Sequence, residues 1–109
     1  MSYSHPIDRL FELIERRKSA DPSASYTAKL FSHGVLKIAK KVGEEGVETA
    51  LAAVAQDKPA LASESADLLY HLLVLWAACG VQPEEVYVAL ETRAGRSAPE
   101  EKAAPGRPT

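Results

Sequence analysis

The sequence predicts an all-α fold, a small bundle of about five helices that dimerises. Apolar residues recur three and four positions apart, in segments separated by proline, glycine and aspartate. No segment shows the strict apolar–polar alternation that is typical of a strand. The length of 109 residues corresponds to one domain. A domain of this size buries only about 60–65% of its unfolded surface, which favours dimerisation.

Two helices are expected before the longest one. Pro6 suits a first helical turn, and the apolar spacing after it predicts a helix that ends near Arg17. A loop rich in turn-forming residues follows, and Ser25 is placed to cap a short helix over 26–33. Gly34 is expected to end or kink that short helix.

A longer helix is expected from residue 35 to about residue 55. It contains two glycines, each of which lowers helix stability by about 1 kcal/mol relative to alanine. On a helical wheel they belong to a stripe of small residues opposite the acidic side chains, and such a stripe lets another backbone come close. The stripe consists of Ala39, Gly43, Gly46, Ala50 and Ala53. We therefore interpret the glycines as packing devices.

Two further helices complete the bundle. Asp57 is placed to cap a helix that runs to about Ala78 and ends at Gly80. The second half of this helix is apolar on nearly every side, so we expect it to be buried in the bundle or in a dimer interface. Pro83 starts the last helix, which is expected to end near Arg93.

The chain from Gly95 onward is rich in proline, glycine, alanine and charge, which predicts disorder. We therefore expect a helical domain over 1–94 and a disordered tail over 95–109. The net charge of −2 provides no basic field for nucleic acid. The lone Cys79 excludes a disulfide framework. The start lacks signal-peptide features, and the apolar run 72–79 is too short to span a membrane, so a soluble cytoplasmic protein without membrane partners is expected.

Acidic residues recur on two consecutive predicted helices. The first contains Glu-Glu-x-x-Glu over 44–48, and the second contains Glu-x-x-Asp over 64–67. At about 100° per residue, the candidate site residues of each helix fall within a sector of about 60°, with Glu45 on the shoulder of the first sector. These residues are Lys37, Lys41, Glu44 and Glu48 on the first helix, and Glu64, Asp67 and His71 on the second.

Antiparallel packing of the two helices would bring up to five carboxylates together. Such a group repels itself unless a cation binds in it. Oxygen ligands without a cysteine or histidine cluster favour Mg²⁺, or Mn²⁺, over Zn²⁺. The nearby lysines indicate that an anion, and a phosphate chain in particular, arrives with the metal. This combination predicts metal-assisted attack by water, with a carboxylate taking the proton.

Several roles remain open at this level. Lys37 and Lys41 either bind phosphate or pair with neighbours on a solvated face, as Lys41 does if it meets Glu45. His71 lies four residues after Asp67, and a hydrogen-bonding or core role is favoured over metal ligation. Apolar neighbours surround both residues in the sequence, so neither is expected to face bulk water.

Three segments resemble the phosphoribosyl-ATP pyrophosphohydrolase family, within the all-α NTP pyrophosphohydrolase (MazG-like) superfamily. They are Ser-Tyr-Thr-Ala-Lys-Leu at 25–30, Lys-Val-Gly-Glu-Glu-Gly-Val-Glu-Thr-Ala at 41–50, and Glu-Ser-Ala-Asp-Leu-Leu-Tyr-His-Leu-Leu-Val-Leu at 64–75. The resemblance covers roughly 7–93. It implies Mg²⁺-dependent hydrolysis of phosphoribosyl-ATP to phosphoribosyl-AMP and pyrophosphate, the second step of histidine biosynthesis, by a homodimeric, stand-alone enzyme.

The resemblance also implies roles for individual residues. Metal binding falls to Glu44, Glu45, Glu48, Glu64 and Asp67, and water activation to Glu44, Glu45 or Glu48. Substrate contacts fall to Lys37, Lys41, Tyr26, Thr27 and His71. Two alternatives share the pattern, a house-cleaning pyrophosphohydrolase acting on (d)NTPs and a non-catalytic helical dimerisation module.

Overall fold

A computed structural model describes the backbone of residues 5–103 and the side chains of residues 5–95. Within these residues the chain is helical and contains no strand, which confirms the predicted all-α class. The elements in order are α1 (Pro6–Arg16), the 3-10 turn η1 (Arg17–Ser19), α2 (Tyr26–His33), α3 (Val35–Val54), α4 (Lys58–Cys79) and α5 (Pro83–Ala103).

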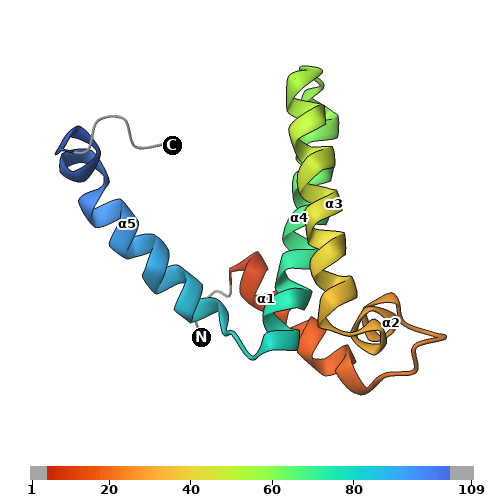
Figure 1. Ribbon diagram of the computed structural model, residues 1–109. Helices are drawn as coiled ribbons and strands as arrows, with labels where there is room; N and C mark the ends of the chain where they lie inside the picture. The colour runs from red at the N-terminus through yellow and green to blue at the C-terminus, as the bar shows by residue number, and fades with distance from the viewer. Residues whose placement is uncertain (1–4, 104–109) are drawn as a thin grey trace.

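The α3 and α4 helices form a long antiparallel hairpin, the upright pair in Figure 1. A tight connection joins them: Gln56 adopts a left-handed backbone conformation with φ of 59°. Asp57 then caps α4, and its carboxylate accepts a hydrogen bond from the Ala60 N–H at 3.0 Å. At the far end of α4, Gly80 closes the helix with φ of 78°. Both predicted ends of α4 are confirmed.

The N-terminal helices pack across the base of this hairpin (Figure 1). Ser25 begins α2 as expected, because its hydroxyl accepts the Ala28 N–H at 3.2 Å. Gly34, with φ of 89°, separates α2 from α3. A positive φ at this position is readily adopted by glycine, so α2 ends where the sequence predicted and α3 leaves in a new direction.

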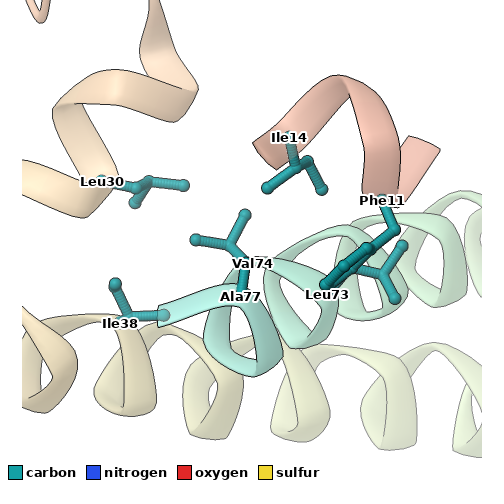
Figure 2. Packing of buried hydrophobic residues seen from close by; sticks show 7 residues of the cluster. All are labelled: Phe11, Ile14, Leu30, Ile38, Leu73, Val74 and Ala77. Carbon is teal, nitrogen blue, oxygen red and sulfur yellow. The ribbon is translucent and has the colours of Figure 1, made fainter. Parts of the chain in front are cut away.

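The hydrophobic core lies at this base, where α1 and α2 meet the start of α3 and the end of α4 (Figure 2). Its buried members come from four helices. They are Phe11, Ile14, Leu30, Ile38, Leu73, Val74 and Ala77. The rest of the α3–α4 hairpin extends beyond this core, so its residues pack mainly between the two helices.

The last helix differs most from its prediction. α5 leaves the rest of the fold after Gly80 and packs on α1, where the Tyr87 hydroxyl donates to the Asp8 carboxylate at 2.7 Å. Burial and the adjacent Asp8 carboxylate raise the pKa of Tyr87 to about 12. The expected end near Arg93 was wrong, because α5 continues to Ala103. This extension runs against helix propensity, because the stretch contains both Gly95 and Pro99. Residues 104–109 of the expected tail lie outside the described residues.

The outer face of α3 has no intramolecular cover in residues 5–95. A Cβ added at Gly43 or Gly46 would meet nothing within 4 Å, so no backbone of the described chain approaches the small-residue stripe. Beside the stripe, Val47, Leu51 and Val54 are exposed by 59%, 62% and 80%. Among the described residues no single helix meets the length and hydropathy of a membrane span, and α4 with the start of α5 does so only as a pair bent by 114°.

Candidate metal and active site

The α3–α4 hairpin brings three carboxylates together. One oxygen from each of Glu45 and Glu48 on α3 and Glu64 on α4 lies within 4.8 Å of the other two. Thr49 holds the helices together at this level. Its hydroxyl lies 2.8 Å from the Glu45 carbonyl oxygen and 3.2 Å from the Glu64 carbonyl oxygen, so it donates to carbonyls of both helices.

Glu45 is the most buried member, with 7% of the residue exposed. Its Oε2 atom lies 3.8 Å from Lys41 Nζ. Its Oε1 atom is buried and has no hydrogen-bond partner among the described residues. A buried carboxylate oxygen without a donor is destabilising, and a cation at this position would remove the penalty.

Glu64 experiences the crowding of negative charge most directly. Loss of hydration raises the pKa of its carboxyl, and the carboxylates of Glu48, Glu45 and Asp67 raise it further. A cation bound among these carboxylates would relieve their mutual repulsion.

The remaining predicted acids lie around this group. Glu44 is exposed and outside the set of three close oxygens. Asp67 contributes negative charge next to Glu64, but it is also outside that set. Asp67 is exposed, so the expectation that it avoids bulk water was wrong for this chain alone.

The two lysines behave differently from each other. Lys41 pairs with Glu45 through the i,i+4 contact, one of the two alternatives that the sequence left open. Lys37 is exposed, one turn before Lys41 on α3. A partly exposed Lys–Glu pair with this separation contributes little to stability.

A second set of polar contacts joins α2 to α4 below the acidic group. The Tyr26 hydroxyl lies 3.1 Å from His71 Nε2, and His71 Nδ1 lies 2.8 Å from the Asp67 carbonyl oxygen. A carbonyl only accepts, so Nδ1 bears hydrogen, and in the neutral ring Nε2 accepts from Tyr26. His71 is buried, and both of its ring nitrogens make hydrogen bonds within the chain.

Thr27 and Tyr70 form the parallel contact, with their hydroxyls hydrogen-bonded to each other. Burial raises the pKa of Tyr70, and the hydrogen bond with Thr27 lowers it by less. Tyr26 and Tyr70 stack with ring centroids 6.1 Å apart. These contacts place the predicted substrate residues Tyr26 and Thr27 against the helix that provides Glu64.

Sequence reasoning missed Thr49 and Tyr70 as site residues. Thr49 follows Glu48 directly, and a threonine between two helix faces gives no distinctive sequence signal. Tyr70 precedes His71 within an apolar run, where a tyrosine is usually a packing residue. Their roles become visible only once α2 and α3 lie against α4.

The donor set fits a hard divalent cation. It offers carboxylate oxygens only, one of them buried and unpartnered, and Lys41 beside them. A set of carboxylate oxygens does not have the ligands of a thiolate or imidazole metal centre.

The comparisons with known proteins agree with this chemistry. The model of the family described as phosphoribosyl-ATP pyrophosphohydrolase matches residues 7–94. A phosphoribosyl-ATP pyrophosphatase of Azospirillum brasilense is 58% identical over 96 residues, which cover 88% of this chain and 86% of the relative. That of Parvibaculum lavamentivorans is 58% identical over 100 residues, 92% of each chain. That of Paramagnetospirillum magneticum is 54% identical over 96 residues, 88% of each chain. The chain therefore belongs to the phosphoribosyl-ATP pyrophosphohydrolase family, as its motifs predicted.

Proposed function

We propose that this protein hydrolyses phosphoribosyl-ATP to phosphoribosyl-AMP and pyrophosphate, the second step of histidine biosynthesis. Water adds to phosphorus, the anhydride bond between the α and β phosphates breaks, and pyrophosphate leaves. The observation that supports this most is the convergence of Glu45, Glu48 and Glu64 around a buried oxygen that lacks a partner. Family membership supplies the substrate.

We propose Mg²⁺ as the metal, with Mn²⁺ as a substitute of the same ligand preference. The residues that would hold it are Glu45, Glu48 and Glu64, with Glu44 and Asp67 at the edge of the group. When bound, the ion neutralises phosphate oxygens and orients the attacking water.

The side chains divide the remaining work. One of Glu44, Glu45 and Glu48 accepts the proton of the water, and the exposed positions of Glu44 and Glu48 leave them accessible to it. Lys37 and Lys41 lie one turn apart on α3 and stabilise charge on the phosphate chain. The contact of Lys41 with Glu45 is weak enough for Lys41 to bind a phosphate oxygen instead.

Tyr26, Thr27 and His71 form the substrate side of the site. Their hydrogen bonds hold α2 against α4, so the nucleotide meets a preformed wall rather than a mobile one. The His71 ring is fixed by two hydrogen bonds, which keeps the Tyr26 ring at the mouth of the site.

We propose a homodimer whose interface covers the outer face of α3. Val47, Leu51 and Val54 lie at spacings of four and three residues, on the side of α3 away from α4, and all three are exposed. A second copy is the occupant that a chain of this size needs, because its own core is confined to the base of the hairpin. We place the enzyme in the cytoplasm and assign its domain to residues 1–94.

Steady-state release of pyrophosphate tests the assignment directly. Purified protein with millimolar Mg²⁺ is given phosphoribosyl-ATP in one series and a panel of dNTPs in another. We expect the higher kcat/KM with phosphoribosyl-ATP. Preference for a simple dNTP would favour the house-cleaning alternative, and no turnover of any nucleotide would favour the dimerisation module.

A further inference from the structure

A second polar depression is lined by Tyr26 but not by His71. This pocket has a volume of about 590 Å³ and lies between the loop 22–25 and one face of α2. Its volume falls in the usual range for small-molecule sites. The groups on its α2 side are Tyr26, Lys29, Ser32 and His33.

The chemistry of this α2 pocket favours an anion. Lys29 and His33 lie one turn apart and are both exposed, and no carboxylate is among the lining residues. The nearest loop acid, Asp21, is occupied by the loop itself, because its carboxylate accepts the Ser23 N–H at 3.0 Å. Lys29 therefore lines the pocket with no carboxylate among the other lining residues.

The pocket hydroxyls are engaged locally, which leaves the basic side chains to define its specificity. Ser25 accepts the Ala28 N–H, and Ser32 donates to the Lys29 carbonyl oxygen at 2.6 Å. Neither Lys29 nor His33 makes an ion pair or hydrogen bond through its side chain within residues 5–95.

A short chain of contacts links the pocket to the acidic group. Tyr26 lines the pocket and reaches His71, and His71 reaches the carbonyl of Asp67. Glu64 and His71 are seven residues apart on α4, a separation of about 10 Å along the helix axis. A single ligand that extends past Tyr26 could therefore have one end at the basic α2 pocket and the other end at the acidic group.

The substrate named by the family has anionic groups at both ends, a triphosphate and the 5′-phosphate of the phosphoribosyl group. We propose that the α2 pocket binds this phosphate monoester, with Lys29 as the specificity-determining residue and His33 beside it. The inference rests on the proposed function and adds what distinguishes phosphoribosyl-ATP from ATP or a dNTP. The monoester bears about −1.5 to −2 charges near neutral pH and suits a lysine contact.

The test pairs one variant with two substrates. Lys29→Gln is assayed with phosphoribosyl-ATP and with the analogue in which the 5′-phosphate is replaced by a hydroxyl. We expect kcat/KM for phosphoribosyl-ATP to fall about tenfold, mainly through KM, and the preference for the phosphorylated substrate to shrink by the same factor. His33→Gln should shift the preference in the same direction by a smaller factor.

Lys58→Gln is the matched control, because it removes the same charge from the first residue of α4. The α3 helix, which is about 30 Å long, separates Lys58 from α2. This variant should leave the preference unchanged. Equal loss on both substrates, or no loss with Lys29→Gln, would overturn the inference while the proposed function stands. Failure of the wild-type protein to hydrolyse phosphoribosyl-ATP would overturn both, and that result is visible before any variant is made.

Discussion

The Thr49 hydroxyl on α3 lies 3.2 Å from the backbone carbonyl oxygen of Glu64 on α4. It also lies 2.8 Å from the Glu45 carbonyl oxygen, so its one hydrogen is shared between carbonyl oxygens of α3 and α4 beside the acidic group. Three carboxylates that repel one another thus lie beside a neutral contact that holds their helices together.

Replacing Thr49 by valine should lower the free energy of unfolding by about 1 kcal/mol, because it removes a hydrogen bond while keeping nearly the same volume. Urea denaturation without metal measures this change. Thr92→Val is the control, since the Thr92 hydroxyl bonds the Val88 carbonyl oxygen of its own helix and the residue is exposed. Equal effects of the two substitutions would contradict a role for Thr49 between helices.

Glu48→Gln should yield a folded protein whose kcat is lower by about 10²-fold or more, the scale of lost acid–base and metal assistance. Glu48 is exposed, so the amide is accommodated without a packing change. Glu84→Gln at the exposed start of α5 removes the same charge far from the site and should retain wild-type turnover. Unchanged turnover in Glu48→Gln would support the non-catalytic alternative.

The metal-free protein should lose stability as the pH rises through the raised pKa of Glu64. Because this pKa exceeds its unfolded value of 4.5, the folded state binds the proton more tightly, and that contribution is present at low pH and lost on ionisation. Glu64→Gln should abolish this part of the pH dependence, so its Tm without metal should exceed that of the wild type at neutral pH. Thermal melts in steps from about pH 4 to pH 7 check this.

Addition of millimolar Mg²⁺ should raise the Tm of the wild type at neutral pH, because only the folded state presents the site. The increase should shrink on acidification, since the ligands must lose their protons to bind metal. Glu64→Gln should show a smaller increase at every pH. A wild-type Tm that ignores Mg²⁺, with and without nucleotide, would argue against a metal site between α3 and α4.

The proposed dimer should dissociate when charge is placed on the outer face of α3. Leu51→Glu puts a carboxylate between the exposed side chains of Val47 and Val54, where burial in an interface would leave it unpaired. Sedimentation velocity should report a dimer for the wild type and a monomer for the variant. Gln56→Glu adds the same charge at the exposed tip of the hairpin, outside the apolar face of α3, and this variant should remain dimeric. A monomeric wild type would remove the dimer from the proposal.

Much of the fold was predictable because local chemistry sets the helix ends. Ser25, Asp57 and Gly80 act as caps through contacts within a few residues, and those contacts follow from the sequence alone. The end of α5 was not predictable in this way, because Gly95 and Pro99 favour an earlier end than the one in the structure.

The sequence predicted five candidate acidic residues, and the structure brings three of them together, Glu45, Glu48 and Glu64. The wheel fixes the angles between Glu44, Glu45 and Glu48, yet it does not say which side of α3 the partner helix covers. In the structure α4 packs on the side that contains Ile38, Glu45 and Thr49, so Glu45 is buried and Glu44 is exposed. Likewise, the hydrogen bond from Tyr26 to His71 joins residues 45 positions apart, which no local pattern encodes.

Tyr26→Phe tests whether this long-range hydrogen bond shapes the substrate side of the site. The change removes the hydroxyl that donates a hydrogen bond to His71 Nε2. The hydrogen bond from His71 Nδ1 to the Asp67 carbonyl oxygen remains. We expect KM for phosphoribosyl-ATP to rise several-fold, with kcat changed less, because the α2 wall loosens while the acidic group stays intact. Tyr87→Phe is the matched control, since it deletes the same atom from a hydrogen bond between α5 and α1. It should lower the free energy of unfolding by about 1 kcal/mol and leave KM unchanged. Parallel shifts of KM in both variants would mean that lost stability, rather than the contact with His71, governs binding.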